Sequence, residues 1–564
     1  MTWHGSAVVL ACGLSAASYT SAQAPPGKVP APRHIGTMTA FWQNRPMVDR
    51  WLVNGGGLQG ETPKHMTLVR FLGGWNRNWT NGEVKPGTST EDYDLAYRGD
   101  DGKIHYRWGL AKGRLDPYVK AGCGITIVLD NTPWCFRSKE GKGPYGNADP
   151  PTSFEEWGAF IEELCRQLVQ FYGADMVNQW RFRMGTECQG KARFTGTQDE
   201  FHKLYDYAAD AVKRVLPSAK FGPFNLAGNP TGPNVSFNKL VEHCAAETNH
   251  ATGKVGAPVD FASVSIYTSP SLLRDILRTT NPQFKAQQKI DFWNGLSEKW
   301  PQLAEISREV HEFGILGNEF KAGSGEPGAR GDAWYFHLMM TLFEGGMDRL
   351  YLWDHRGWLF SFLEQTVGSE AYSLKPTLEP VEQDVNALPD DLKAIATFER
   401  PQELAKPGGL FVKSVAFVQD DRTFVITSAY HEDRFVTDPV DVTVTLPKSL
   451  LPAAETPRIR FAAMTRTGSK YYHIRQDLAA AGLLDATFAA VPGLLSKGML
   501  GPRNSPGREL VAKNSAKYRD IEEDLRTLKP FDGGVEAVGD GQKITFRMAP
   551  PSVMVVVLDN SGSD

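Results

Sequence analysis

Hydrophobic and polar residues follow one recurring order between residues 34 and 353: a short apolar run, a polar turn, then an amphipathic segment. The run at 124–129 (GITIVL) is continuously apolar, which is typical of a strand buried on both faces. The segment at 153–172 has apolar side chains at helical spacing, with Ser153 placed to cap it and Gly173 to end it. The pattern therefore predicts strands that alternate with helices.

This order repeats often enough to predict eight strands. They fall at 34–42, 66–73, 124–129, 180–184, 220–226, 260–267, 314–316 and 349–353. The segments expected to be helical lie between them, at 115–120, 153–172, 199–216, 237–247, 293–310 and 332–343. Eight strands separated by helices predict an α/β fold, and specifically a (β/α)₈ TIM barrel.

After residue 365 the pattern changes. Residues 366–400 are rich in Pro, Glu and Asp, whereas later stretches such as 422–430 (RTFVITSAY) alternate like strands. Helical inserts are expected near 478–484 and 520–528. The predicted domains are a catalytic barrel at 33–365, a connection at 366–400 and a β-sandwich at 401–564.

The N-terminal segment is predicted to be a targeting signal rather than part of a domain. An apolar run at 7–17 and small residues before Pro25 predict a signal peptide at 1–24, followed by a Pro-rich tether at 25–32. The mature protein is therefore expected to be periplasmic or secreted. A lipoprotein anchor at Cys12 is the less favoured alternative, because the apolar run before it is very short.

Composition excludes several classes of protein. The 564 residues carry a formal net charge of -4 without a basic, aromatic cluster, so nucleic acid is not an expected partner. No apolar run reaches the length of about 18 residues that spans a membrane. The cysteines and histidines show neither zinc spacing nor an HExxH pattern, so no metal and no cofactor are expected. The expected partner is a carbohydrate, and the oligomeric state stays open.

Two glutamates at predicted strand ends carry the candidate chemistry. The strand at 180–184 breaks at Gly185 and presents Glu187, and the strand at 314–316 is followed by Glu319 before a Gly-rich loop. Parallel α/β barrels carry their catalytic groups at the carboxyl ends of their strands. A single glutamate in such a place is usually solvated or salt-bridged. The pair instead predicts a paired-carboxylate site.

Other side chains at strand ends are candidates for sugar binding. Aromatic rings can stack on the apolar faces of sugars, and polar groups can bind hydroxyls. Each has a structural alternative, which is core packing for a tryptophan and an ion pair for the arginine. The candidates are Arg70, Trp75, Asp130, Asn131, Trp134, Asn225 and His355.

With these residues in place, the layout resembles the retaining glycoside hydrolases of the large (β/α)₈ clan. It is most similar to glycoside hydrolase family 39, the β-xylosidase and α-L-iduronidase group, over about residues 33–560. The resemblance implies that Glu187 is the general acid/base and Glu319 the nucleophile. It also implies that Tyr267 contacts the nucleophile and that Trp353 is a sugar platform.

One position departs from that clan. An asparagine usually precedes the acid/base and binds the sugar 2-hydroxyl, whereas here Thr186 stands there and Asn318 precedes Glu319 instead. Both are candidate substrate contacts, and the departure argues against a standard β-xylosidase. The expected function is an exported retaining glycosidase acting on an oligo- or polysaccharide. The alternative is a non-catalytic carbohydrate-binding barrel, which the loss of either glutamate would indicate.

Overall fold

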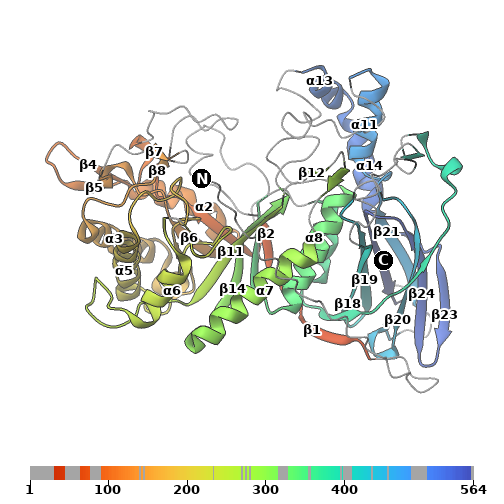
Figure 1. Ribbon diagram of the computed structural model, residues 1–564, viewed down its shortest axis with the longest axis horizontal. Helices are drawn as coiled ribbons and strands as arrows, with labels where there is room; N and C mark the ends of the chain where they lie inside the picture. Colours follow the sequence, from red (N-terminus) through yellow and green to blue (C-terminus); the bar gives the residue numbers. More distant parts are fainter. Residues whose placement is uncertain are drawn as a thin grey trace, which may run out of the picture.

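The computed structural model describes the chain from residue 31 to residue 560 apart from several internal segments. The segments outside the description are 45–63, 76–90, 139–141, 144–145, 233, 269–270, 274–275, 279–280, 316–327, 354–356, 391, 394–396, 398–408, 434–435, 454–456 and 484–504. The predicted signal peptide and almost all of the tether lie outside it as well. Figure 1 shows two regions, with helix-covered parallel strands on one side and a C-terminal pair of sheets on the other.

Eight parallel strands form the first region, and we call them the barrel strands. In chain order they are β2 (Trp42–Asn44), β3 (Met66–Arg70), β6 (Gly124–Leu129), β9 (Arg181–Met184), β10 (Lys220–Gly222), β11 (Phe261–Thr268), β14 (Ser307–Ile315) and β15 (Arg349–Leu352). They pair as two four-stranded sheets, β10-β9-β6-β3 and β11-β14-β15-β2. A parallel bridge from Leu226 to Val264 joins the sheets on one side, and β2 contacts β3 on the other. In the part of the chain that the structure describes, this region is therefore an α/β fold built on parallel strands.

Helices follow most of these strands and cover their outer face (Figure 1). They are α2 (Trp108–Lys120), α3 (Phe154–Tyr172), α4 (Ala174–Val177), α5 (Gln198–Val215), α6 (Phe237–Ala246), α7 (Pro282–Lys299), α8 (Ala329–Glu344) and α9 (Trp358–Leu363). Ser153 caps α3 by accepting a hydrogen bond from the backbone N–H of Glu156, as expected, and Thr197 and Glu200 form a capping box on α5. Short hairpins decorate the loops: β4 (Ala96–Arg98) with β5 (Ile104–Tyr106), β7 (Lys142–Gly143) with β8 (Gly146–Asn147), and β12 (Ser271–Leu273) with β13 (Ile276–Arg278).

Two predicted strands differ from the structure. The predicted first strand at 34–42 is two elements: β1 (Arg33–Thr37) joins a C-terminal sheet, and only β2 is a barrel strand. The seventh is a nine-residue strand, β14, which begins at Ser307, so the helix predicted at 293–310 is wrong beyond Lys299. The reason is that charged residues of β14 face the polar interior of the barrel strands, which hides the apolar alternation of a strand.

Two antiparallel sheets form the C-terminal region. The larger has the order β1-β16-β18-β19-β25-β21-β22 and the smaller β17-β20-β24-β23. Their remaining members are β16 (Glu370–Leu374), β17 (Thr377–Pro380), β18 (Phe411–Val418), β19 (Arg422–Tyr430), β20 (Val440–Leu446), β21 (Arg458–Met464), β22 (Lys529–Pro530), β23 (Gly534–Val538), β24 (Gly541–Met548) and β25 (Ser552–Asp559). The stretch 366–400, predicted to be a connection, therefore supplies β16 and β17. Strand β17 escapes the sequence pattern because it is exposed along its whole length and so shows no apolar alternation.

Each face of the larger sheet has its own core. In β18, Ala416 packs toward the smaller sheet, whereas Val415 and Phe417 belong to the large core shared with the barrel helices. Strand β25 is buried along all eight residues because helix α8 covers one face and the smaller sheet covers the other. The two regions are thus packed closely together.

A helical insert of the C-terminal region contacts helix α9. It consists of α11 (Lys470–Ala480), α13 (Pro506–Lys513) and α14 (Ser515–Arg526), at the upper right of Figure 1. The indole N–H of Trp358 on α9 donates to the carbonyl of Leu525 over 2.7 Å. Among the residues that the structure describes, none of the helices could cross a bilayer, since none combines the needed length with enough apolar character.

Candidate active site

The carboxyl ends of β3 and β6 hold a buried arginine. Arg70 donates from Nε to Asp130 Oδ1 over 2.8 Å and from Nη2 to Asn131 Oδ1 over 2.5 Å. Its guanidinium also lies 4.2 Å from the centre of the Trp75 ring. Burial alone would raise the pKa of Asp130, but the charge and hydrogen bond of Arg70 outweigh it, so this pKa is lowered. The ion-pair role considered for Arg70 is therefore present, and its partner is Asp130.

Trp75 and Trp134 are packed together rather than open to solvent. Their side chains are only 3% and 2% exposed, and the Trp134 indole N–H donates to the carbonyl of Trp75 over 3.2 Å. The turn that leads to them needs glycine, because a Cβ on Gly73 would lie 2.3 Å from Asp94 Oδ1. Core packing, the alternative for these tryptophans, describes their place in this structure.

Glu187 follows β9 in a strained conformation. Its φ is +51°, and Asn131 at the end of β6 has φ +48°. They are the non-glycine residues with positive φ in the described part of the chain. Such conformations cost about 1 kcal/mol or more, and they gather at sites where the surrounding structure enforces them. The preceding Gly185 is also constrained, since a Cβ there would lie 2.5 Å from Cys188 Sγ.

Strand β11 supplies the partners of Glu187. The Ser265 hydroxyl donates to Glu187 Oε1 over 2.8 Å and accepts a hydrogen bond from Asn225 Nδ2 over 2.7 Å. Asn225 is fully buried and forms a parallel bridge with Thr186. Asn225 was expected to contact substrate, and in this structure it orients the serine that holds Glu187.

The hydroxyl of Thr186 is also engaged within the protein. It accepts a hydrogen bond from Arg183 Nη2 over 2.6 Å and bonds to the carboxylate of Asp130. A threonine hydroxyl has one proton and two lone pairs, so these two partners use the proton and one lone pair. Its predicted contact with sugar is therefore limited to accepting a hydrogen bond at the remaining lone pair.

A second glutamate in this region escaped sequence analysis. Glu312 lies within β14, is 3% exposed, and its Oε2 accepts a hydrogen bond from the Tyr267 hydroxyl over 2.8 Å. Its backbone is paired with Ser265, the residue whose hydroxyl binds Glu187. Paired parallel strands lie about 4.8 Å apart. The structure therefore brings Glu187 and Glu312 to the same point of the barrel strands.

A bulge in β14 explains the position of Glu312. Val264 pairs with Val310, but the next residue, Ser265, pairs with Glu312, so His311 is an extra residue on β14. Side chains that would normally alternate thus both point into the interior: His311 contacts Arg183, and Glu312 contacts Tyr267. At such a bulge, successive side chains no longer alternate between the two faces of the strand, so the alternation does not predict Glu312. The expected contact of Tyr267 with a carboxylate is the observation that could have pointed to it.

Of the remaining predicted site residues, the structure describes one and leaves three outside the described residues. Trp353 directly follows β15, is partly exposed, and its Cβ lies 3.9 Å from where a Cβ on Gly314 would be. The predicted nucleophile Glu319, its neighbour Asn318 and the predicted ligand His355 lie outside the described residues. Their roles stay predictions.

A group of histidines and carboxylates lies on the outer helices α5 and α6 and the loop after α6. The ring of His202 stacks on that of His243 at 4.1 Å, and His250 stacks on the other side at 5.6 Å. His243 Nε2 lies 2.9 Å from Asp206 Oδ2 and its Nδ1 lies 3.0 Å from Glu247 Oε2. Three such ligand types close together could in principle hold a metal ion.

Hydrogen bonding argues against a metal ion in this group. The Ser236 N–H donates to Gln198 Oε1, which turns the amide NH₂ of Gln198 toward His202 Nε2 at 2.7 Å. His202 Nε2 must then accept, so its Nδ1 carries the proton and has no lone pair for a metal ion. Both nitrogens of His243 face carboxylates, so this ring carries two protons. A charged His243 between two carboxylates accounts for the cluster without a metal.

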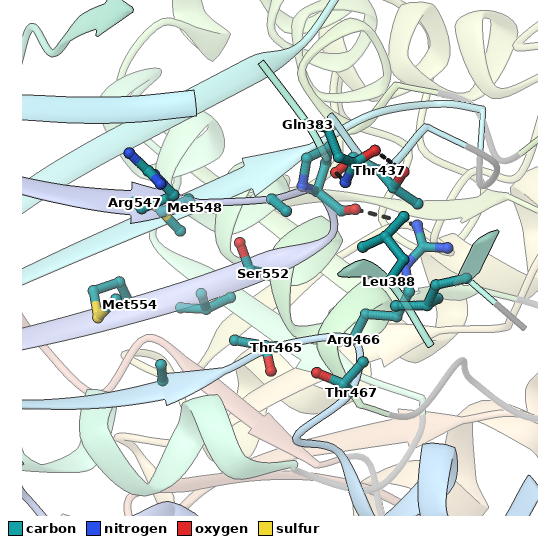
Figure 2. Close-up of a pocket in the computed structure, with 15 residues that line it drawn as sticks. Gln383, Leu388, Thr437, Thr465, Arg466, Thr467, Arg547, Met548, Ser552 and Met554 are labelled. Atoms are coloured by element: carbon teal, nitrogen blue, oxygen red, sulfur yellow. Dashed lines mark hydrogen bonds between the residues drawn. The ribbon is translucent and has the colours of Figure 1, made fainter. Parts of the chain in front are cut away.

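The cavity in Figure 2 lies in the C-terminal region, away from the barrel strands. It has a volume of about 140 Å³ and lies between β21, β24 and β25 and the segment around Leu388. Arg466 spans its edge by donating to the carbonyls of Val436 and Pro550, both over 3.1 Å. No aromatic side chain is among its lining residues, so it lacks a surface on which a sugar ring could stack.

A partly buried glutamate after β9 and a buried glutamate in β14 share the partner strand β11, an arrangement that is found in enzymes acting through paired carboxylates, as glycosidases do. Comparisons with known proteins agree. The family model "Glycosyl hydrolases family 39" matches residues 87–292, which include Glu187 and Tyr267. The resemblance to glycoside hydrolase family 39 is thereby confirmed, and the class of enzyme is a retaining glycosidase.

Individual relatives carry different activities. An α-1,4-L-rhamnosidase of Formosa agariphila is 26% identical over 59% of this chain and 68% of its own length. A β-xylosidase of Caldicellulosiruptor saccharolyticus is 33% identical over 32% of this chain, which spans only 35% of that relative. The crystal structure of a GH39 enzyme from Xanthomonas axonopodis pv. citri has a TM-score of 0.55 at 14% identity, over 93% of this chain and 95% of that one. That structure agrees with this chain in fold.

Proposed function

We propose that this protein is an exported retaining glycosidase that cleaves glycosidic bonds of an oligo- or polysaccharide, with Glu187 as acid/base and Glu312 as nucleophile. The observation that carries the proposal is the shared partner strand β11. Its Ser265 binds Glu187 and is paired with Glu312, and its Tyr267 binds Glu312. The eight strands, on this proposal, close into a (β/α)₈ barrel that holds both carboxylates at one end.

The two carboxylates have different surroundings, which suits different roles. A nucleophile must be ionised, and the Tyr267 O–H stabilises the charged form of Glu312 by donating to it. The acid/base must exchange a proton during each turnover, and Glu187 lies in the loop just after its strand, where a leaving group could reach it. A retaining mechanism needs the two carboxyl groups about 5–5.5 Å apart, which side chains that converge from β9 and β14 on the shared partner β11 can provide.

Glu319 remains the competing candidate for the nucleophile. It follows the same strand, and the resemblance to family 39 first suggested it. Glu312 is preferred because its contact with Tyr267 is the one expected of a nucleophile in this clan. The alanine variants of the two glutamates provide a matched comparison.

Sugar specificity has to be found by screening. The relatives named above are a rhamnosidase and a xylosidase, and these activities set the first aryl glycosides to try on this chain. Export rests on the apolar run at 7–17 and the small residues before Pro25. An intact Met1 on the protein isolated from its native host would contradict export.

The test is chemical rescue of alanine variants on an aryl glycoside that the wild-type enzyme hydrolyses. Glu312→Ala should lose several orders of magnitude in kcat, and azide should restore turnover with inverted product. Glu187→Ala should lose little kcat/KM on activated leaving groups and much on poor ones, because kcat/KM reports the first step. Its kcat should be limited by slow deglycosylation, and azide should relieve this limit and give product of retained configuration. Full activity of Glu312→Ala together with loss in Glu319→Ala would transfer the nucleophile to Glu319.

A further inference from the structure

A line of buried polar groups crosses the interior of the barrel strands behind Glu187. Glu309, His311 and Arg183 are each 0% exposed. Glu309 Oε2 lies 2.6 Å from His311 Nε2, and His311 Nδ1 lies 2.9 Å from Arg183 Nη1. Two of these groups are on β14 and the third is on β9, so the line connects the two sheets. Buried polar groups of this kind need every hydrogen bond to be made.

The direction of each hydrogen bond follows from the chemistry of arginine. A guanidinium can only donate, so His311 Nδ1 accepts from Arg183, and the proton of the ring is on Nε2. That N–H donates to Glu309, which also accepts from Arg181 Nε over 2.9 Å. Burial lowers the pKa of His311, which keeps the ring neutral. The donor and the acceptor of each hydrogen bond between Glu309, His311 and Arg183 are therefore defined at neutral pH.

Arg183 ends this line on the turn that carries the acid/base. Its Nε donates to the carbonyl of Gly185 over 3.0 Å and its Nη2 donates to the Thr186 hydroxyl over 2.6 Å. All three nitrogens of the guanidinium are thus used, two of them on the turn and one on His311. Glu187 follows immediately with φ +51°, a conformation that its surroundings must enforce.

We propose that Arg183 and His311, anchored by Glu309, are positioning residues that hold the Gly185–Thr186 turn and thereby aim the carboxyl group of Glu187 at the leaving-group oxygen. The proposal rests on the proposed role of Glu187. The bulge of β14 serves both parts of the site, because it turns His311 toward Arg183 and Glu312 toward Tyr267. All three network residues are fully buried, so they are assigned a positioning role and no contact with the sugar.

The test compares substrates with activated and poor leaving groups in a set of variants. His311→Leu removes both hydrogen bonds of the ring, whereas His311→Gln keeps an acceptor and a donor. In His311→Leu, kcat/KM for a poor leaving group should fall by roughly 10-fold to 100-fold, as for other groups that orient a reacting side chain. For an activated aryl glycoside, which needs no proton, it should fall by less than about threefold. His311→Gln should recover part of the loss.

A control comes from a buried hydrogen bond outside the network. Ser414 Oγ and Thr427 Oγ1 lie 2.8 Å apart between β18 and β19 of the C-terminal region. Thr427→Val removes this hydrogen bond without changing shape, and both substrates should be affected equally and weakly. If His311→Leu fails to fold, Arg183→Lys takes its place, since it keeps the charge but loses the fork of donors.

Two outcomes would overturn the proposal. Equal losses of kcat/KM on both substrates in His311→Leu would show that the network only stabilises the fold. Unchanged kcat/KM on both would show that the turn needs no support. Glu187→Ala in the same assay separates this inference from the proposed function: if that variant shows no dependence on the leaving group, the role of Glu187 itself is wrong.

Discussion

At the scale of single residues, the site depends on hydroxyl groups that hold carboxylates. Ser265 holds Glu187 and Tyr267 holds Glu312, and both hydroxyls come from the interior face of β11. A hydrogen bond to a charged partner is worth about 1.5–3 kcal/mol, more than one between neutral groups. Removing either hydroxyl should therefore lower activity and should cost some stability as well.

Tyr267→Phe tests this expectation on the nucleophile. The ring stays and only the donor to Glu312 is lost, so kcat should fall by roughly 10-fold to 100-fold on every leaving group. Melting temperature should fall moderately, because the buried Glu312 loses a donor, so kcat is compared at a temperature where both proteins are folded. A Tyr267→Phe enzyme with wild-type kcat would contradict the assignment of Glu312, since the nucleophile would then have no need of this donor.

At the scale of elements, sequence analysis succeeded where one physical rule governs a segment. The apolar run of β6 and the capped amphipathic helix α3 have the predicted positions within a residue, and so does β19. It failed at β14, because Glu309, His311 and Glu312 face a polar interior and the bulge breaks the alternation. The glutamate of the site that contacts Tyr267 was missed for the same reason.

The buried His243 on the outer helix α6 leads to a prediction about how stability depends on pH. Burial lowers the pKa of His243, but the hydrogen bond to Asp206 outweighs burial, and Glu247 adds to it, so the pKa is raised. When the pKa of a histidine is higher in the folded protein than in the unfolded chain, its protonation stabilises the fold. This stabilisation is fully present below the pKa of the unfolded chain, about 6.5, and is lost as pH rises through the pKa of the folded protein. The melting temperature of the wild type should exceed that of His243→Gln most near pH 5.5, and the difference should shrink toward pH 9.

A chelator provides the control for that experiment. A charged His243 between Asp206 and Glu247 needs no metal ion, so EDTA should leave the melting temperature unchanged. A fall in melting temperature with EDTA that zinc restores would contradict the proton account. A difference between the two proteins that grows with pH would contradict it as well.

At the scale of the whole molecule, the C-terminal sheets are part of the same packed body as the barrel strands. Arg330 on α8 is 6% exposed and donates to the carbonyls of His431 and Glu432, over 3.4 and 2.8 Å. Lys413 on β18 pairs with Glu344 at the other end of α8, at 2.9 Å. The alternating strands of this region were predicted from the sequence, but the role of 366–400 and of β1 depends on long-range pairing that no local pattern reveals.

Arg330→Met tests the strength of this interface. The methionine fills similar space but leaves buried carbonyls without donors, which should lower the free energy of unfolding by about 1–3 kcal/mol. Urea denaturation followed by tryptophan fluorescence measures it. Arg98→Met is the control, because its pair with Glu156 is exposed and should contribute less than about 1 kcal/mol. Equal effects of the two variants would contradict a stabilising role for Arg330 at the interface.

The most direct measurement for the whole account is the identity of the glycosylated residue. A 2-deoxy-2-fluoro glycoside of the preferred sugar with an activated leaving group should trap the covalent intermediate. The fluorine slows both the formation and the hydrolysis of the intermediate, and the activated leaving group speeds its formation alone, so the intermediate accumulates. Digestion and mass spectrometry then locate the added sugar. The account predicts a single label on Glu312. A label on Glu319 or on another carboxylate, or a wild-type product of inverted configuration, would contradict it.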